Sequence, residues 1–584
     1  MAAPWTRHYD PEVPPSLAPY PAKTLVDYVR ETAAARPDAP AIFFKGITLS
    51  NKDLDRLTDS FAASLLDAGI KKGDRVALVL PNCPQFLIAE IGAWKAGATV
   101  LPLNPLYTGG ELREPLTTAG VEVLVTLTPF YKRLKEIQPE TAVRRIIATS
   151  IKEYLPPLLR VLFTVFKEKK AGHRIELERG DQWFQECLTR SADVQVGTTA
   201  ERAPSPDDPA IMLMSGGTTG MPKAVVGLHR CLVAAGLQLA TWLHPPKNAP
   251  QDIALVPLPL FHVYACVGVQ SHSLISRTPM ALVPNPRDID DLLKTIKTVR
   301  PTLFSAVPAL FIALLNHPKV KNKSVDFSSI RCCFSGAAAL MAATKTQFEE
   351  LTGGRIVEGY SLTEAMMACV VNPLNGINKV GSVGVPLPDV EVAIVDAESG
   401  STFLRNGETG EIILRAPQLM AGYFNNAEET TRALRVHPST TPGTGDPARW
   451  LHTGDLGYLD ADSFLFIVDR QKDLIKTSGY QVWPREIEEI LAAHPCVQEV
   501  GVAGVPDDVK GEAVKAWVVK RAGTNPSVDE LRAYCKQKLA PYKTPAHVEF
   551  REALPKTMAG KVLRRALVAE HRERQARPKP SSTS

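Results

Sequence analysis

The sequence predicts an α/β protein in which a large N-terminal domain of parallel-rich sheets and helices precedes a small α+β domain. Three observations support this fold class. Strand-like apolar runs alternate with helical patterns, a compact set of helix and strand signals follows residue 472, and 584 residues exceed what one small domain needs. We expect one domain over 1–470, a second over 471–573, and a disordered tail of low apolar content over 574–584.

The first elements show the alternation directly. Apolar residues repeat at helical spacing at Leu54, Leu57, Phe61 and Leu65, and this helix ends before Gly69. A buried strand over 75–80, a helix over 86–97, a strand over 99–101 and an apolar run over 121–127 follow. Such βαβ units predict a mostly parallel sheet with helices on both faces.

Residues 153–169 combine apolar and basic side chains and allow two interpretations. In the first, the segment is a helix that is buried around most of its circumference. In the second, it is an interfacial segment whose apolar side enters a bilayer while Lys and Arg meet anionic headgroups.

The small domain has its own helix and strand signals. After a Pro- and Gly-rich loop over 436–449, Pro484 starts a helix that His494-Pro495 stops. Strand-like runs over 500–505 and 513–520 come next. Ser527 and Glu530 then predict a capping box at the start of another helix.

Composition excludes several classes of protein. With 45% hydrophobic and 22% charged residues the chain resembles an average folded protein, and interspersed charges with a formal net charge of +5 give no reason to expect a nucleic-acid partner. Nine cysteines without a CxxC pair fit a reducing compartment. We see no secretory signal and no apolar run long enough to span a membrane. We therefore expect a cytoplasmic protein, with peripheral contact to the inner face of a membrane through 153–169.

The most distinctive stretch runs from Ser215 to Lys223. Its three glycines let a ligand approach the backbone, while its serine, two threonines and lysine offer donors that suit a polyphosphate. The spacing differs from that of a Walker A loop. Taken alone, the string also fits an ordinary Gly/Thr hairpin.

This string resembles the phosphate loop of the adenylate-forming superfamily, which contains acyl- and aryl-CoA synthetases, luciferases and peptide-synthetase adenylation domains. Four further regions resemble family motifs in the same order: 358–364, 450–455, 469–488 and 555–561. The resemblance implies a large domain that binds ATP and the acid, and a small domain that moves between two catalytic poses.

For ATP, the resemblance implies phosphate contacts by Ser215, Gly216, Gly217, Thr218, Thr219, Gly220 and Lys223. Glu364 would bind Mg²⁺, a hard cation that prefers carboxylate oxygen, and Thr363 would act near the α-phosphate. The stretch 334–339, with Gly336 and Ala337, would line the adenine and acyl pocket, and Glu358, Gly359, Tyr360 and Ser361 of the tyrosine-containing motif would also bind the nucleotide. Asp455 would accept both ribose hydroxyls, with Arg470 beside the same sugar.

For catalysis, the resemblance implies roles for Lys561, Thr219, Glu364 and His262. Lys561 would clamp the acyl carboxylate and the α-phosphate as a point charge, and His262 would gate the acyl site. Lys472 would be the pivot of the small domain, Gly479 would let the pantetheine of coenzyme A pass, and Lys476 belongs to the same hinge region. Residues Ala224, Ala338, Ala339 and Ser463 stand where relatives often have glycine, which leaves the shape of the pocket open.

Within the superfamily the chain is most similar to bacterial long-chain fatty acid–CoA ligases, for example at 104–108, at 284–288 and in the insertion at 153–170. This implies a ligase that forms acyl-AMP and pyrophosphate, then acyl-CoA and AMP, from a fatty acid, ATP and CoA. A medium-chain or aryl acid–CoA ligase, a ligase that loads a carrier protein, and a catalytically silent binding protein are the alternatives. A homodimer is a further partner arrangement that the sequence leaves open.

Overall fold

The computed structural model describes residues 3–189, 203–215, 223–244, 251–338, 340–437, 448–470, 473–477, 480–507, 510–556 and 562–576. It divides into two compact units. Unit 1 comprises Met1–Glu391 and Arg415–Leu451, and unit 2 comprises Val392–Leu414 and His452–Ser584. Among the described residues, no helix combines the length and apolar character needed to cross a bilayer.

The first sheet of unit 1 has eight strands. Their spatial order is β19 (Gly422–Tyr423), β9 (Lys223–Leu228), β8 (Pro209–Ser215), β4 (Thr99–Pro102), β3 (Arg75–Val79), β5 (Val123–Leu127), β6 (Arg145–Thr149) and β7 (Gln182–Trp183). The pairs from β8 to β7 are parallel, with Val76 opposite both Val100 and Val123. The predicted βαβ alternation over 75–127 is confirmed.

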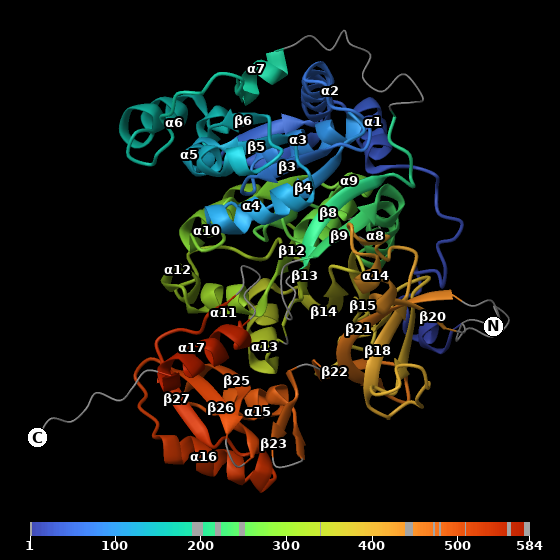
Figure 1. The fold of residues 1–584 in the computed structure, drawn as a ribbon, viewed down its shortest axis with the longest axis vertical. Helices are drawn as coiled ribbons and strands as arrows, with labels where there is room; N and C mark the ends of the chain where they lie inside the picture. Colours follow the sequence, from blue (N-terminus) through green and yellow to red (C-terminus); the bar gives the residue numbers. More distant parts are fainter. Residues whose placement is uncertain are drawn as a thin grey trace, which may run out of the picture. The chain divides into compact units, whose positions relative to one another are not determined.

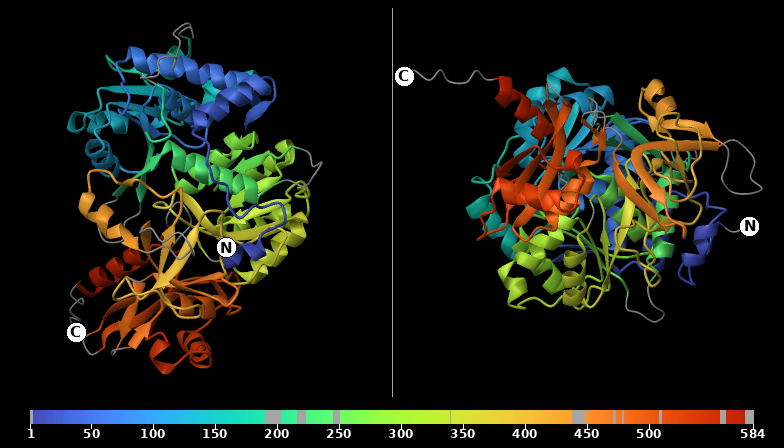
Figure 2. Two further views of the ribbon diagram at one scale, coloured as in Figure 1. Left: turned by 90° about the vertical axis from the view of Figure 1, so that its right-hand side faces the viewer. Right: turned by 90° about the horizontal axis from the view of Figure 1, so that it is seen from below.

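The helices around this sheet cover both faces (Figure 1). α4 (Gly109–Thr118) and α5 (Thr128–Ile137) bury Leu112, Leu116 and Leu134 in a core with the strands. α3 (Pro84–Lys95) packs on β3 and β4, and α2 (Asn51–Asp67) packs on α3. The turned views in Figure 2 show the same layers in blue and cyan.

The second sheet of unit 1 has nine strands. Their order is β16 (Val385–Pro386), β15 (Met367–Val371), β14 (Arg355–Leu362), β13 (Cys332–Ser335), β12 (Leu303–Ala306), β10 (Ala254–Val256), β11 (Met280–Leu282), β1 (Pro40–Phe44) and β2 (Ile47–Ser50). The six strands from β14 to β1 pair in parallel. Because their carboxyl ends share one edge, loops that follow β12, β13 and β14 meet there.

The remaining helices of unit 1 connect these strands. They are η1 (Pro4–His8), α1 (Leu25–Ala35), η2 (Gln138–Glu140), η3 (Ile151–Tyr154), α6 (Pro157–Leu162), the π-helical η4 (Phe163–Lys167), α7 (Phe184–Thr189), α8 (His229–Trp242), the π-helical η5 (Tyr264–Val269), α9 (Gln270–Ile275), α10 (Ile289–Val299), α11 (Pro308–Asn316), α12 (Pro318–Lys321), α13 (Ala342–Thr352) and α14 (Ala427–Ala433).

A third sheet is formed where the chain passes between the units. Its order is β17 (Glu391–Val395), β18 (Gly410–Arg415), β21 (Ala448–Leu459) and β20 (Leu434–His437), and β22 (Leu465–Arg470) also pairs with β21. β21 and β22 are antiparallel, which places Asp455 opposite Arg470.

The last part of unit 2 is a small α+β body. Its sheet has the order β24 (Tyr480–Val482), β23 (Ile475–Thr477), β26 (Gly511–Lys520) and β25 (Val497–Asp507), with β27 (His547–Arg551) on β26. The helical elements are α15 (Pro484–Ala492), α16 (Val528–Lys536), η7 (Pro541–Lys543) and α17 (Arg564–Ala576). The capping box of Ser527 and Glu530 forms as predicted. α17 extends to Ala576, three residues into the segment predicted as a tail, and the rest of that segment lies outside the described residues.

The structure contradicts one interpretation of residues 153–169. A helix buried around most of its circumference is wrong, because α6 and η4 bury no residue and Leu158 and Phe166 are 72% and 71% exposed. Apolar content could not decide this point, because a buried and an exposed helical face have the same spacing.

Candidate functional site

The predicted phosphate loop connects the antiparallel strands β8 and β9. Ser215 ends β8 and lies opposite Lys223, which begins β9. The intervening Gly216, Gly217, Thr218, Thr219 and Gly220 lie outside the described residues. The hairpin thus fixes the two ends of the loop next to one another.

Lys223 belongs to a chain of polar contacts that reaches Glu364. Its ammonium group pairs with the carboxylate of Glu429 and lies 5.1 Å from the ring centroid of Tyr423. Tyr423 Oη donates to Glu364 Oε1 at 3.1 Å. Tyr423 is in place because β19 pairs with β9, with Tyr423 opposite Val225. Two residues predicted for ATP and Mg²⁺, Lys223 and Glu364, therefore lie on either side of one tyrosine.

The charges in this chain have physical consequences for its titratable groups. Burial, reinforced by the charge of Glu364, raises the pKa of Tyr423, so the phenol stays a hydrogen-bond donor. The hydrogen bond from Lys223 lowers the pKa of Glu429. Glu429 also lies 2.6 Å from Arg432 Nη1, so its carboxylate bridges two cations.

The predicted nucleotide-binding residues Gly336, Ala337 and 358–361 follow β13 or lie on β14. Glu358 lies opposite Ser335 in the parallel register, and Ser335 directly precedes Gly336. Glu358 Oε2 accepts a hydrogen bond from Leu340 N at 3.3 Å. Ala337 has a φ of 69°, a left-handed conformation that is unusual for alanine. Gly359 lies opposite Val371 in β15, Tyr360 is buried, and Ser361 and Thr363 are half-buried.

His262 precedes the π-helical η5, whose first residue is Tyr264. His262 Nδ1 accepts from Tyr264 N at 3.3 Å. Removal from water lowers the pKa of His262 to about 4, so the imidazole is neutral near pH 7. Tyr264 Oη donates to Phe334 O at 2.8 Å, which ties η5 to β13. The geometry places His262 near the strand end that carries Gly336.

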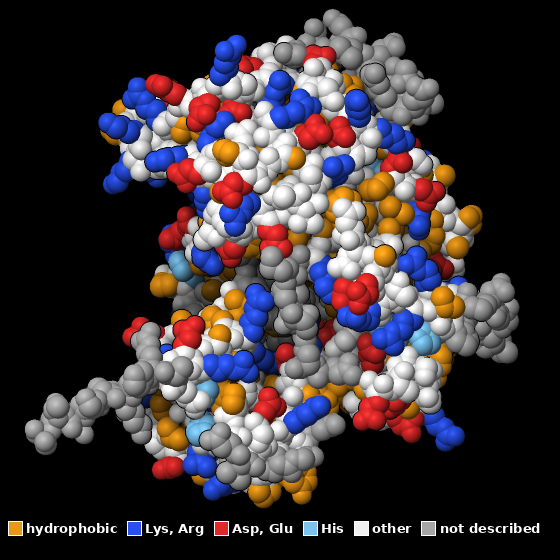
Figure 3. All heavy atoms as spheres, in the orientation of Figure 1, with side chains coloured by type: hydrophobic (Ala, Val, Ile, Leu, Met, Phe, Trp, Pro, Cys, Tyr) orange, Lys and Arg blue, Asp and Glu red, His pale blue; other side chains and the backbone are white. Residues whose placement is uncertain are grey.

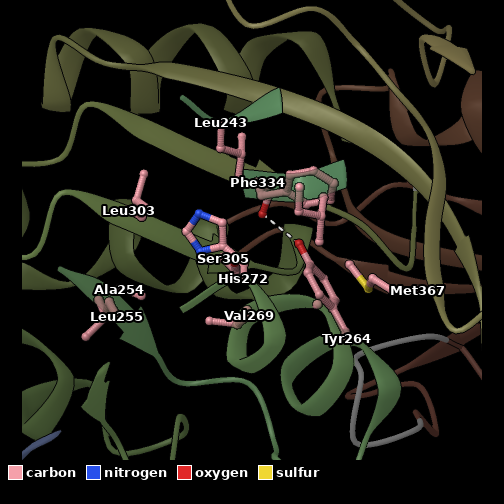
Figure 4. Close-up of a pocket in the computed structure, with 12 residues that line it drawn as sticks. Leu243, Ala254, Leu255, Tyr264, Val269, His272, Leu303, Ser305, Phe334 and Met367 are labelled. Atoms are coloured by element: carbon pink, nitrogen blue, oxygen red, sulfur yellow. Dashed lines mark hydrogen bonds between the residues drawn. The ribbon is translucent and has the colours of Figure 1, made fainter. Parts of the chain in front are cut away.

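A small cavity of about 30 Å³ lies next to this tie (Figure 4). It has room for only one or two water molecules and is far smaller than the roughly 300–1,000 Å³ that is typical of small-molecule pockets. Its walls come from α8, β10, η5, α9, β12, β13 and β15 and are mainly apolar: Leu239, Leu243, Ala254, Leu255, Tyr264, Gly268, Val269, His272, Leu303, Ser305, Phe334 and Met367. Burial lowers the pKa of His272 to about 4, so this wall residue is also neutral near pH 7.

In unit 2, the predicted ribose residues form a pair on adjacent strands. Arg470 Nε lies 3.0 Å from Asp455 Oδ1, and Asp455 is 5% exposed. The backbone N of Asp455 donates to Thr453 Oγ1 at 3.1 Å, while that hydroxyl donates to Ile412 O at 2.7 Å. The strand pairing therefore presents the carboxylate with one side already occupied by a guanidinium group.

Glu411 supports the same motif from β18. Its Oε1 accepts from Gly454 N at 3.1 Å, and its Oε2 lies 2.9 Å from Nδ1 of His452. The two partners of Glu411, the backbone of Gly454 and the imidazole of His452, belong to the turn that directly precedes Asp455. A buried carboxylate with two donors restrains this turn more firmly than neutral partners do.

The predicted hinge and lysine residues are only partly described. Lys472, Gly479 and Lys561 lie outside the described residues. Lys476 lies on β23 and its side chain is exposed. The neighbours of the Lys561 segment, Lys556 and Val562, form an antiparallel bridge.

Arg564, at the start of α17, ties this segment to the hinge region. Its guanidinium donates to Glu488 at 2.7 Å, Asp473 at 2.7 Å and Asp469 at 3.2 Å. These carboxylates raise the pKa of Arg564 against an opposing effect of burial. One cation thus joins α15, α17 and the residues on both sides of 471–472.

Sequence reasoning missed Tyr423, Glu429, Glu411 and Arg564. Each acts through a partner distant in the chain, as Tyr423 does with Glu364, 59 residues away. The available signals were a tyrosine after glycine at 422–423, acidic residues in the first turn at 428–429, and an arginine three residues after Lys561. None of these signals identifies its partner.

The residues around Glu364 fit a magnesium ion. The carboxylate is half-exposed and already accepts a bond from a neutral phenol, and Mg²⁺ prefers a few carboxylate oxygens with its remaining ligands from water and phosphate. A bound Mg²⁺ would neutralise charge on the phosphates beside Lys223.

Comparisons with known proteins cover nearly the whole chain. The family model described as AMP-binding enzyme matches residues 29–424, and the AMP-binding enzyme C-terminal domain matches 486–561. The long-chain-fatty-acid–CoA ligase of Bacillus subtilis (strain 168) is 39% identical over 572 residues, 98% of each chain. That of Escherichia coli O157:H7 is 34% identical over 97% of this chain and 98% of the other.

One relative is named for a different acid, and the fold is shared with solved structures. The 4-coumarate–CoA ligase 2 of Oryza sativa subsp. japonica is 33% identical over 94% of this chain and 92% of the other. Among solved structures, ATP-bound MatB from Rhodopseudomonas palustris has a TM-score of 0.79 at 26% identity, and 95% of this chain and 99% of that one are covered.

Proposed function

Because the chain belongs to the AMP-binding enzyme family, we propose that it is an ATP-dependent long-chain fatty acid–CoA ligase. It joins a fatty acid to the α-phosphate of ATP with release of pyrophosphate. Coenzyme A then attacks the acyl carbonyl and AMP leaves. ATP, Mg²⁺ and CoA are the cofactors and co-substrates of this family.

In the first step, negative charge must be neutralised on the attacking carboxylate and on the phosphates. Lys223 and the loop from Ser215 to Thr219 would bind the β- and γ-phosphates. Glu364 would hold Mg²⁺, with Thr363 near the α-phosphate. Asp455 would accept the ribose hydroxyls beside Arg470, and Lys561 would clamp the acyl carboxylate. The contact of Tyr423 with both Lys223 and Glu364 supports their joint action on one polyphosphate.

We place the acyl tail among the apolar residues of η5, α9, β12 and β13, where the cavity of about 30 Å³ must widen to admit it. Burial of an alkyl chain contributes about 0.8 kcal/mol per methylene, so affinity grows with chain length until the cavity is filled. The neutral states of His262 and His272 fit an apolar ligand, because a charged imidazole would oppose its entry. The observation that carries the fatty-acid assignment is the similarity over nearly the full length to long-chain-fatty-acid–CoA ligases, at 39% and 34% identity.

In the second step, the thiol must reach the carbonyl that Lys561 holds in the first. We assign the pivot to Lys472 and the pantetheine passage to Gly479, with Lys476 in the same hinge region. Only a few hinge residues need to change backbone angles. The network of Arg564 supports this assignment, since it joins both sides of the pivot to the helix that follows Lys561.

The alternative is a ligase for medium-chain or aryl acids, which the similarity to 4-coumarate–CoA ligase 2 favours. A panel of C4–C18 acids with benzoate and coumarate, assayed with ATP, Mg²⁺ and CoA by mass spectrometry, decides between them. Palmitoyl-type thioesters with stoichiometric AMP are the expected products. Better use of aryl acids would replace the assignment, and acyl-AMP without thioester would indicate carrier loading.

The division of roles has its own test. Lys561→Ala should impair adenylate formation far more than thioester formation from supplied acyl-AMP. An equal loss in both steps would contradict the assignment of Lys561 to the first step.

We also propose a cytoplasmic location with peripheral contact to the inner face of a membrane. The exposed apolar side chains of α6 and η4 support this contact. A homodimer stays a prediction that no contact described above tests.

A further inference from the structure

Three side chains with metal-binding atoms meet in the small body of unit 2. His494 and Cys496 flank one proline between the end of α15 and the start of β25, and Glu530 lies in the first turn of α16. A ring nitrogen of His494, the sulfur of Cys496 and a carboxylate oxygen of Glu530 all lie within 4.8 Å of one another. None of the three has a role in the proposed reaction.

The packing of α15 on α16 fixes the two sides of this cluster. Ile487 and Leu491 of α15 and Leu531 of α16 are fully buried in one hydrophobic core. The ring of His494 is buried and packs edge-on against Tyr534 of α16, with ring centroids 4.8 Å apart. The core therefore holds the histidine beside the start of α16.

Glu530 has one oxygen left for this cluster. Its Oε2 accepts from Ser527 N at 3.4 Å in the capping box of α16, and its Oε1 lies 3.6 Å from Nε2 of His494. That separation is longer than a good hydrogen bond. It is close to the roughly 3.3–3.6 Å that separates two ligands of a tetrahedral zinc ion, each about 2.0–2.3 Å from the metal. The pair is thus better spaced for a shared metal ion than for a direct bond.

The thiol of Cys496 is the accessible one in this chain. All nine cysteines lie among the described residues, and eight of them are buried whereas Cys496 is only partly buried. A thiolate and a carboxylate carry two negative charges, which a divalent cation balances. Thiolate and imidazole ligands favour Zn²⁺ over Mg²⁺ and Ca²⁺, which prefer oxygen ligands.

The surface around the cluster gives no reason for non-specific cation binding. Over the small body of β23 to β27, at the lower left of Figure 3, basic side chains in blue and acidic side chains in red are interspersed. Binding of a metal ion would therefore depend on the donor atoms and their geometry.

We propose that His494, Cys496 and Glu530 bind a zinc ion that joins the end of α15 to the start of α16. Nε2, Sγ and Oε1 supply three ligands, and water supplies the fourth. The thiol proton passes to solvent. The imidazole proton moves to Nδ1, which gives up a long hydrogen bond of 3.3 Å from Cys496 N. Rotation of the exposed Glu530 side chain closes the remaining separation of about 1 Å.

The test is titration of the tag-free, full-length protein with Co²⁺, a spectroscopic substitute for Zn²⁺. Excess Mg²⁺ is present and ATP is left out, so that Mg²⁺ occupies carboxylate sites such as Glu364. A bond between Co²⁺ and a thiolate gives a charge-transfer absorption that imidazole and carboxylate ligands alone do not give. We expect one Co²⁺ per chain with this absorption, and its displacement by Zn²⁺.

Matched variants assign the ligands. Cys496→Ser should abolish the absorption and lower the affinity for Zn²⁺ at least about tenfold, because one of three protein ligands is lost. Glu530→Gln should also weaken binding while α16 keeps its cap, since glutamine completes a capping box as well. Asp529→Asn and His547→Gln change an exposed acid and an exposed histidine of the same body and should bind like the wild type.

Thermal unfolding gives a second readout. Saturating Zn²⁺ should raise the unfolding temperature of unit 2 in the wild type and in both controls, because the ion binds the folded state, and it should not do so in Cys496→Ser.

Three results would overturn the proposal: no thiolate absorption of the wild-type protein with Co²⁺, an absorption that neither Glu530→Gln nor His494→Gln weakens, or equal affinity of Cys496→Ser for Zn²⁺. Formation of acyl-CoA is not a readout in these experiments. Failure of the proposed function would therefore leave the zinc site intact, and loss of the zinc site would leave the proposed function untouched.

Discussion

Replacement of Glu90 by glutamine should change the pH dependence of stability of unit 1. Glu90 lies on α3 and is 0% exposed. Gln270 Nε2, at the start of α9, donates to its Oε2 at 2.5 Å, and its Oε1 has no hydrogen-bond partner among the described residues. Burial raises the pKa of Glu90 to about 8, against the opposing effect of Gln270. The carboxyl group is therefore protonated in the folded protein at neutral pH.

The sign follows from proton binding. Between the ordinary pKa of 4.5 and the folded pKa of about 8, the folded state holds a proton that the unfolded state has lost, so stability falls as pH rises. One pKa unit corresponds to about 1.4 kcal/mol. Over the whole interval the loss approaches about 5 kcal/mol, and between pH 6 and pH 8 it is roughly 2–3 kcal/mol.

Glu90→Gln has nearly the same shape and does not titrate. Its amide would find an acceptor in Gln270 Oε1, which has no donor among the described residues. The variant should therefore gain about 1.4 kcal/mol per pH unit relative to the wild type between pH 6 and pH 8. Urea unfolding followed by tryptophan fluorescence measures this difference, and Trp94 on the same helix is fully buried.

A difference between the two proteins that does not change with pH would refute this reasoning. The exposed substitution Glu350→Gln on α13 controls for the loss of one formal charge. The thiol of Cys266 on η5 is the titratable group that faces Glu90, and burial raises its pKa well above the ordinary value. It therefore stays neutral through the measured interval and adds no slope.

Three further predictions concern contacts in the candidate site. Glu411→Ala removes the acceptor of Gly454 N and the partner of His452, so KM for ATP should rise about tenfold, which corresponds to a loss of about 1–2 kcal/mol of binding free energy. Glu411→Gln should recover part of this affinity, and an unchanged KM in both variants would contradict a positioning role for Glu411. Tyr423→Phe should slow pyrophosphate release about three- to tenfold, because the hydrogen bond to Glu364 is lost. Tyr423→Leu should slow this release further, because the ring beside Lys223 is lost as well. Equal rates of pyrophosphate release in the two variants would exclude a role for the ring. Arg564→Met leaves three carboxylates without their cation and should destabilise unit 2 by about 3 kcal/mol in calorimetry, whereas the exposed Arg572→Met should not.

Local patterns predicted the early elements because each has a strong period and a clear stop. The helix expected from Leu54 to Gly69 is α2 (Asn51–Asp67), and the strand expected over 75–80 is β3 (Arg75–Val79). The order of strands could not be predicted in this way. β8 lies between β9 and β4, although more than 100 residues separate β4 from β8, since pairing depends on packing across the whole unit.

The same limit applies to the candidate site. Motif strings could indicate Lys223 and Glu364, because glycine, hydroxyl and charged residues at fixed spacing have a chemical meaning. They could not indicate that Tyr423 joins them, or that Glu411 restrains the turn before Asp455. These contacts depend on strand registers that local sequence does not encode. The exposure of α6 and η4 could not be predicted for a similar reason. The ring contact between Phe163 and His173 holds the segment to unit 1, and both residues resemble ordinary core residues in the sequence.

Under the proposed function, the wall of the cavity takes part in the choice of acid, because similarity over nearly the whole chain extends to relatives named for different acids. Gly268, which lines the cavity, and Gly336, two residues after the lining residue Phe334, illustrate how close packing sets its shape. A Cβ at Gly268 would lie 2.8 Å from Cε of Met367, and a flexible thioether can move aside. A Cβ at Gly336 would lie 3.2 Å from Cε1 of Tyr264, a stiff ring that its hydrogen bond to Phe334 O holds in place. The Tyr264 side of the cavity is therefore the rigid side, and under the proposed function a change in acyl range should follow more readily from substitutions at the Met367 side.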